Sequence, residues 1–206
     1  MVSRKQLSIA LSQNYEDFQS PKIDYEQYGT SVDITSGLLF RAFNLGDIEG
    51  CNVVDLCSGP GIIGIGAVLM GAESCTFVEV EKGAVEILRG NIARFDVGEK
   101  CTIVEGDALN VEGHFETCVM NPPFGIQQGR GDMVFLRKAL EIADVVYSIH
   151  DGSEKNKEYI PGFIKKLGYQ PLEYYIESLA LKRSYTFHKK AVKQHSVMIL
   201  RSMKNI

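Results

Sequence analysis

Residues 51–64 have the sequence CNVVDLCSGPGIIG, in which a short apolar run leads through glycines into a second apolar run. The first run, Cys51–Leu56, has the length and the β-branched content of a buried strand. The second, Ile62–Met70, is predicted to be a helix. Glycines let the backbone turn tightly and let a ligand approach it without meeting a Cβ atom. A strand that enters a helix through such a turn is typical of α/β folds, which bind ligands at this position.

Strands and helices alternate along the rest of the chain. Further strands are predicted over the apolar runs Cys75–Val80, Cys101–Glu105, Phe115–Met120 and Val145–Ile149. Helices with one apolar face are predicted over Gly83–Phe95, Asp132–Ala143 and Glu154–Leu167, the last interrupted near Pro161. This alternation predicts a doubly wound, mostly parallel sheet with helices on both faces.

The two ends of the chain depart from this pattern. Two final strands, Pro171–Ser178 and His195–Leu200, have no helical pattern between them, which predicts a hairpin and one antiparallel edge strand in a seven-stranded sheet. At the other end, an amphipathic helix is predicted over residues 3–18. A second helix follows, with Ser31 or Asp33 as its N-cap.

Composition places the chain among ordinary globular proteins. With 206 residues, 45% of them hydrophobic, it fits one domain over 1–206. No apolar run approaches the roughly 20 residues that a membrane span needs, and Met1–Ala10 lacks the apolar core of a signal peptide. The five cysteines form no Cys-x-x-Cys pair, so we expect reduced core residues and no metal site. These features predict a cytoplasmic protein that does not bind membranes.

Charge is unevenly distributed along the chain. The net charge is −4, but residues 178–206, the predicted basic C-terminal hairpin, hold seven Lys and Arg and no acidic residue. The rest of the chain therefore carries 15 − 26 = −11. A basic tail on an acidic body predicts local contact with a polyanion. The alternative is a solvated basic face without a partner.

The glycine turn and two acidic residues point to a nucleoside ligand. Gly59–Gly64 also matches the dinucleotide pattern Gly-x-Gly-x-x-Gly, so the turn by itself fits an NAD enzyme, a methyltransferase or a plain structural turn. Glu79 ends the second strand, where an acidic side chain can accept hydrogen bonds from ribose hydroxyls. Asp107 follows the third strand, where it would accept from the adenine amino group in a methyltransferase or serve only as a turn residue.

The fourth strand ends in the tetrapeptide Asn121-Pro122-Pro123-Phe124, a stiff and extended exit. The Asn121 side-chain oxygen and the Pro122 carbonyl can accept both N–H groups of a planar amine. These bonds would pull the amine nitrogen toward tetrahedral geometry and direct its lone pair at an incoming methyl group, with the base stacked on Phe124. The tetrapeptide predicts methyl transfer to an amino group. A structural edge turn is the alternative.

Together these motifs resemble class I S-adenosylmethionine-dependent methyltransferases that act on amino nitrogens, which implies their Rossmann-like fold. More closely, the chain resembles the methyltransferase-like protein five group, adenine-N6 methyltransferases of small-subunit ribosomal RNA, as a prokaryotic or archaeal-type relative. The likeness runs from about Tyr25 to Lys190. It includes Glu26–Tyr28 with Thr30, Met120–Gly125, Asp132-Met133 with Phe135-Leu136, Ala139–Glu141, Tyr147-Ser148 with His150, and Phe187–Lys190.

The resemblance implies methyl transfer from S-adenosylmethionine, which leaves S-adenosylhomocysteine, to N6 of an adenosine in structured RNA. Residues 1–45 would help to close the cofactor pocket. The implied cofactor contacts are Gln27, Tyr28, Thr30, Asp55, Cys57, Gly59, Pro60, Gly61, Ile62, Glu79, Val80, Asp107, Ala108 and Asn121. Catalysis is expected at Asn121, Pro122, Pro123 and Phe124. RNA contacts are expected at Lys182, Arg183, Tyr185, Phe187, His188, Lys189 and Lys190.

Two departures from the family pattern concern the cofactor pocket. Cys57 stands where the family has a glycine, and the acidic ribose partner is Glu79 in place of the commoner aspartate. The resemblance also implies a small zinc-containing adaptor protein as a possible partner. Other amino groups, such as DNA adenine, guanine N2 or protein glutamine, remain alternative acceptors. An NAD oxidoreductase and a non-catalytic nucleic-acid binding module are the alternatives from other classes.

Overall fold

The structure of the chain, a computed structural model, describes residues 2–18, 29–123, 131–179 and 195–205. One sheet holds seven strands in the order β3-β2-β1-β4-β5-β7-β6. They are β1 (Asn52–Leu56), β2 (Ser74–Glu79), β3 (Cys101–Glu105), β4 (Phe115–Met120), β5 (Ala143–Asp151), β6 (Tyr169–Leu179) and β7 (His195–Lys204). Strands β1 to β5 are mutually parallel where they pair, so their carboxyl ends meet at one edge.

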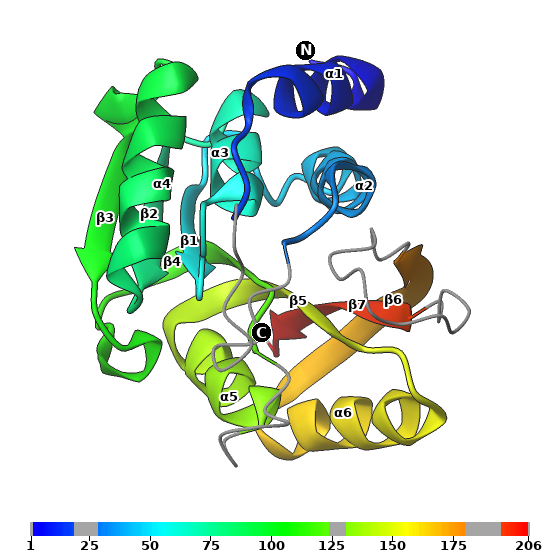
Figure 1. Cartoon of the computed structure of the whole chain (residues 1–206). Helices are drawn as coiled ribbons and strands as arrows, with labels where there is room; N and C mark the ends of the chain where they lie inside the picture. Colours follow the sequence, from blue (N-terminus) through cyan, green and yellow to red (C-terminus); the bar gives the residue numbers. More distant parts are fainter. Residues whose placement is uncertain (1, 19–28, 124–130, 180–194, 206) are drawn as a thin grey trace, which may run out of the picture.

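Helices cover both faces of this sheet (Figure 1). They are α1 (Arg4–Asn14), α2 (Val32–Asn44), α3 (Ile62–Leu69), α4 (Lys82–Arg94), α5 (Asp132–Ile142) and α6 (Glu154–Lys166), with short 3-10 turns η2 (Gly98–Lys100) and η3 (Ala108–Asn110). Alternate strand residues divide the core into two clusters, because successive side chains point to opposite faces. Val53 and Val119 pack with α1 to α4, whereas Val54 and Met120 pack with α5 and α6. No described helix is long and apolar enough to span a membrane.

The predicted fold class is confirmed, with one refinement at the end of the sheet. The antiparallel strand is β7, which pairs with β5 on one side and with β6 on the other. It therefore lies one place in from the edge, and β6 is the edge strand. The predicted pairing of the last two strands is confirmed. Both are longer than predicted, since polar residues such as Arg201 and Ser202 interrupt the apolar pattern but stay within β7.

Two predicted details of the helices are corrected, and one pair of predicted alternatives is decided. Helix α6 runs through Pro161 without the predicted interruption, and burial of Ile160 and Ile164 on one face helps to offset the lost backbone bond. Helix α1 ends at Asn14, so Phe18 lies beyond it. Of the two candidate caps for α2, Ser31 is the N-cap, and its hydroxyl accepts a bond from the Ile34 amide at 3.3 Å.

Candidate active site

The glycine turn after β1 has three residues in the left-handed region of the backbone map. Their φ angles are 58° at Cys57, 54° at Gly59 and 88° at Gly61. At Gly61 a Cβ atom would lie 2.3 Å from Leu88 Cδ1, so a larger residue is excluded by space as well as by backbone angle. The turn then begins α3, whose first residue, Ile62, is buried. The sequence-predicted strand, turn and helix are thus confirmed.

Glu79, the last residue of β2, is bonded to this turn. Its Oε2 accepts a hydrogen bond from the Gly59 amide at 2.8 Å, and its Oε1 accepts from the Val80 and Glu81 amides at 2.9 Å. Burial raises the pKa of Glu79 above its usual value, although these backbone bonds act in the opposite direction. The carboxylate is therefore fixed at the carboxyl edge, directly beside the glycine turn.

Asp55 and Asp107 take different positions around the turn. Asp55 of β1 is 1% exposed, and its Oδ2 accepts a hydrogen bond from the Gly64 amide at 2.8 Å, which joins β1 to the first turn of α3. Burial raises the pKa of Asp55 well above its usual value. Asp107 follows β3, and its side chain caps η3 by accepting from the Leu109 amide at 3.0 Å. The adjacent Gly106 amide donates to the Glu79 carbonyl, which brings the ends of β2 and β3 together.

Asn121 leaves the end of β4 at the same edge of the sheet. Its side-chain Nδ2 donates a hydrogen bond to Thr30 Oγ1 at 2.8 Å. Thr30 is 9% exposed and lies just before the Ser31 cap of α2. Because the nitrogen end of the Asn121 amide faces Thr30, its oxygen end is turned the other way. Pro122 is buried beside it. The structure thus joins Thr30 and Asn121, which are far apart in the sequence.

Residue Asn91 of α4 ties the N-terminal segment to the glycine turn, and no sequence pattern predicted this role. Its Nδ2 donates to the Pro60 carbonyl at 2.9 Å and to the Glu16 carbonyl at 2.8 Å, while its Oδ1 accepts from the Glu16 amide at 2.9 Å. Nearby, the Phe18 ring lies 3.5 Å from where a Gly59 Cβ would be. Asn91 is fully buried, and a buried amide needs hydrogen-bond partners, which the Pro60 and Glu16 backbone groups provide.

Cys57 is a non-glycine residue in a conformation that favours glycine, which makes its replacement informative. A left-handed backbone costs an ordinary residue roughly 1–2 kcal/mol. We expect Cys57→Gly to raise the free energy of unfolding by about 1 kcal/mol, since the lost thiol packing and the greater freedom of unfolded glycine offset part of the gain. Urea denaturation measures this change.

Cys118 provides the matched control for Cys57. Like Cys57 it is a free thiol, but it is fully buried and lies in the extended strand β4, whereas Cys57 is partly exposed. Cys118→Gly is expected to lower stability by about 2 kcal/mol, because it removes buried volume and weakens a central strand. Equal losses in the two variants would show that the Cys57 backbone stores no strain.

Several sequence-predicted site residues lie outside the described residues. They are Gln27, Tyr28, Phe124, Lys182, Arg183, Tyr185, Phe187, His188, Lys189 and Lys190. Of the described candidates, Thr30, Cys57, Gly59, Pro60, Gly61, Ile62, Glu79, Val80, Asp107, Ala108 and Asn121 all lie at or beside the carboxyl edge of β1 to β4. Pro123 follows them as the last described residue of the tetrapeptide.

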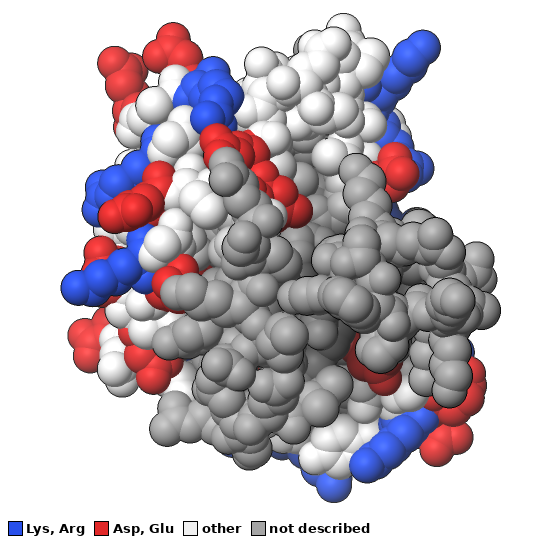
Figure 2. Space-filling model, viewed as in Figure 1, with Lys and Arg blue, Asp and Glu red and all other residues white. Residues whose placement is uncertain are grey.

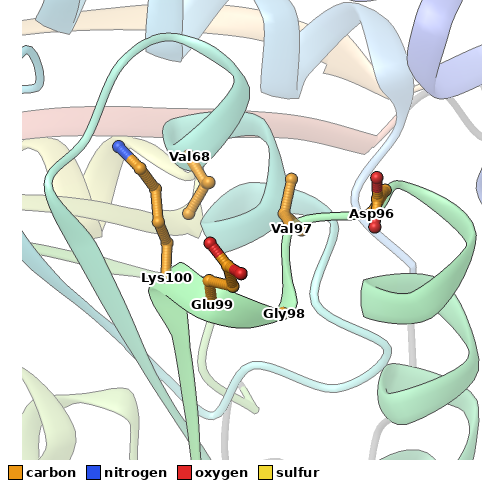
Figure 3. A pocket seen from close by; sticks show the side chains of 6 residues that line it. All are labelled: Val68, Asp96, Val97, Gly98, Glu99 and Lys100. Carbon is orange, nitrogen blue, oxygen red and sulfur yellow. The ribbon is translucent and has the colours of Figure 1, made fainter.

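Other surface features lie away from this edge. A hollow of about 660 Å³ is lined by Val68 of α3 and by residues 96–100, at the edge where β3 begins (Figure 3). Acidic and basic side chains are interspersed over α4 and β3 (Figure 2). Within the described ranges, no group of three or more His, Cys, Asp or Glu is placed to hold a metal ion.

Comparison with known proteins identifies the family. A family model described as Conserved hypothetical protein 95 matches residues 33–167. The rRNA N(6)-adenosine-methyltransferase METTL5 of Danio rerio is 34% identical over 196 residues, which cover 90% of this chain and 91% of the relative. The chain belongs to the METTL5 family. A Drosophila melanogaster member is 33% identical and is covered over 89% of its length.

A solved structure extends the METTL5-family likeness to three dimensions. The protein PH1948 of Pyrococcus horikoshii, described as a proposed RNA methyltransferase, superposes with a TM-score of 0.89 at 38% sequence identity and 100% coverage of both chains. The resemblance that the sequence motifs predicted is thus confirmed for the family and for the Rossmann-like fold. The roles of individual site residues stay predictions.

Proposed function

We propose that this protein transfers a methyl group from S-adenosylmethionine to N6 of an adenosine in structured RNA, and that the RNA is small-subunit ribosomal RNA. The observation that carries the proposal is the position of Asn121, which follows the end of β4 beside the glycine turn. Its side-chain nitrogen donates a hydrogen bond to Thr30. Membership of the METTL5 family supports adenosine in ribosomal RNA as the acceptor.

The chemistry follows from the acceptors that the tetrapeptide provides. The Asn121 amide oxygen and the Pro122 carbonyl would accept the two N–H groups of an adenine amine and orient its lone pair. S-adenosylmethionine supplies an activated methyl group on a sulfonium centre. Alignment and hydrogen bonding by the protein can then provide much of the acceleration, without a strong general base.

The turn and its acidic neighbours fit the proposed cofactor. Gly59 takes the left-handed conformation that shapes the turn, and its amide donates to the carboxyl group of Glu79, which is thereby fixed next to the turn. Glu79 would hold the ribose hydroxyls and Asp107 the adenine amino group. Thr30 would have two roles, because it is an expected cofactor contact and its hydroxyl also accepts a hydrogen bond from Asn121.

Cofactor affinity should depend on pH through Glu79. Only the ionised carboxylate accepts from both ribose hydroxyls, and burial raises its pKa above the usual value. Affinity is therefore expected to be highest above that raised pKa and to fall as the pH drops through it. The stability contribution has the opposite sign: because the folded pKa exceeds the unfolded one, Glu79 favours folding at low pH and loses this contribution as pH rises.

Calorimetry with S-adenosylmethionine between neutral and mildly acid pH measures this dependence. The control variant is Glu79→Gln, whose amide does not titrate and whose weaker affinity should stay constant over the same range. A wild-type affinity that is independent of pH would contradict the assignment of Glu79.

The RNA and partner assignments extend the same proposal. The basic segment 178–206 would contact RNA phosphates, as its charge suggests. The zinc-containing adaptor is a proposal from the family resemblance alone, and pull-down with an adaptor followed by comparison of solubility and activity would test it. We also propose a cytoplasmic location, which the five free cysteines support.

One incubation tests the reaction. Purified protein, labelled S-adenosylmethionine and small-subunit RNA are combined, and the RNA is digested to nucleosides. We expect the label in N6-methyladenosine. Label in another nucleoside would redirect the proposal to a different amino group, whereas calorimetry that shows no cofactor binding would favour a non-catalytic RNA-binding module.

A further inference from the structure

A buried series of polar side chains connects α5 to β5 beside the end of β4. His150 Nδ1 lies 2.5 Å from Asp132 Oδ2, and His150 Nε2 lies 2.8 Å from Ser148 Oγ. His150 and Ser148 have no exposed surface, and Asp132 is 9% exposed. A Ser-His-Asp series can act as a nucleophilic triad only where its serine reaches a substrate. Because this hydroxyl is enclosed, the series can only hold elements together.

The series lies next to the strand that delivers the tetrapeptide. Ser148 of β5 is the register partner of Met120, the last residue of β4, and Asn121 follows at once. His150 is on the same face of β5 as Ser148, since side chains alternate along a strand. Continuing the parallel register by two residues sets His150 level with Pro122.

Asp132 belongs to the element on the other side of the tetrapeptide. It is the first residue of α5, the next helix after Asn121 among the described residues. Helix α5 packs on both β4 and β5. The contact between His150 and Asp132 therefore joins the start of this helix to the strand beside the catalytic exit.

Apolar side chains surround the contact between His150 and Asp132. Met120, Leu136, Val146 and Met198 belong to the apolar cluster on this face of the sheet. A hydrogen bond in such surroundings is hard to replace, because loss of one partner leaves the other buried and unsatisfied. The position of Asp132 in the first turn of α5 is also favourable for a negative charge.

We propose that His150 is a positioning residue for methyl transfer. Held between Ser148 and Asp132, it fixes the start of α5 against the end of β4, and so fixes where Asn121 and Pro122 present their oxygens. This assignment rests on the proposed function. His150 itself contacts no substrate, and the bond to Asp132 carries the effect.

The two ring nitrogens can be tested separately. His150→Ala is expected to lower kcat for adenosine methylation by about tenfold, with the Kd of S-adenosylmethionine changed less than about twofold, because most of the proposed cofactor residues lie around β1 to β3. His150→Asn places an amide nitrogen near the Nδ1 position and should recover most of kcat. His150→Gln places one near Nε2, toward Ser148, and should not.

Tyr147 on the same strand offers a matched control. It is 1% exposed, faces the opposite side of the sheet, and its hydroxyl bonds Asp47 Oδ2 at 2.6 Å and Arg201 Nε at 3.0 Å. Tyr147→Phe removes a buried polar contact from β5 without touching the α5 side. It is expected to lower Tm comparably to His150→Ala but to leave kcat within about twofold of wild type.

A second measurement does not depend on activity. Amide hydrogen exchange in the first turn of α5 should speed up in His150→Ala and not in Tyr147→Phe. The positioning role would be overturned by unchanged exchange in His150→Ala, or by kcat values that follow Tm in all variants. Methylation of adenosine by the wild type would still uphold the proposed function in that case. A wild-type protein that methylates no adenosine would overturn the proposed function and this assignment with it.

Discussion

Asn121→Ala is expected to lower kcat for adenosine methylation by about 100- to 1000-fold, the loss typical of removing one hydrogen-bonding group that acts on the transition state. The side-chain oxygen is one of two acceptors proposed for the adenine amine. Its partner Thr30 fixes the orientation of the amide, with Nδ2 to Oγ1 at 2.8 Å. Without that oxygen the amine lone pair is no longer directed at the methyl group.

Cofactor binding should remain in this variant, because the glycine turn, Glu79 and Asp107 are held by bonds that do not involve Asn121. The Kd of S-adenosylmethionine is expected to change less than about threefold. Calorimetry measures the Kd, and single-turnover methylation of RNA measures the chemical step. Fully active Asn121→Ala would reject the clamp.

Two further variants separate the acceptor from the rest of the side chain. Asn121→Asp keeps an oxygen acceptor at the same place and should retain more activity than Asn121→Ala. Thr30→Val removes the partner that orients the amide, so kcat should fall by about tenfold, while Thr30→Ser keeps the hydroxyl and should be close to wild type. If Thr30 served only the cofactor, Thr30→Val would change Kd and not kcat.

Local patterns were sufficient for two of the parallel strands, β3 and β4. The predicted ranges Cys101–Glu105 and Phe115–Met120 are those observed, since each is a short β-rich run bounded by turn residues. The glycine turn was also predicted, down to the position of Glu79 at the end of β2. Both motifs depend on neighbours in the sequence, so sequence is sufficient to find them.

Contacts between distant residues could not be predicted in this way. The partners of His150 come from α5 and from its own strand, and those of Arg201 include Asp47, at the opposite end of the chain. Arg201 lies within β7 and pairs with Asp47 at 2.7 Å, although its charge argues against a strand in a local pattern. The same holds for Asn91, which is polar and sits on an otherwise apolar helix face.

Glu79→Ala is expected to raise the Kd of S-adenosylmethionine by at least about 100-fold. The substitution removes the proposed ribose acceptor. It also leaves the Gly59 amide, which donates to Oε2 at 2.8 Å, without its partner, so the turn loses its fixed position. Hydrogen bonds to a charged group contribute about 1.5–3 kcal/mol each, and two of them account for the expected loss.

Glu105 is the matched control for Glu79. It ends β3, is the register partner of Glu79, and is exposed. Glu105→Ala changes the net charge by the same amount at the same edge of the sheet, but touches no residue of the turn. The Kd of S-adenosylmethionine for Glu105→Ala should stay within about twofold of the wild-type value. Equal losses in both variants would mean that the effect is general electrostatics and not a specific contact.

The ribose contact itself can be isolated with a thermodynamic cycle. S-adenosylhomocysteine keeps both ribose hydroxyls, and an analogue that lacks them differs only at the atoms that Glu79 would bind. Wild type should discriminate strongly between the two ligands, and Glu79→Ala should not, so the coupling energy between the hydroxyls and the carboxylate is large. Asn121→Ala should discriminate as wild type does. Additive losses in the cycle would assign the effect of Glu79 to the shape of the turn, through Gly59, and not to the ribose.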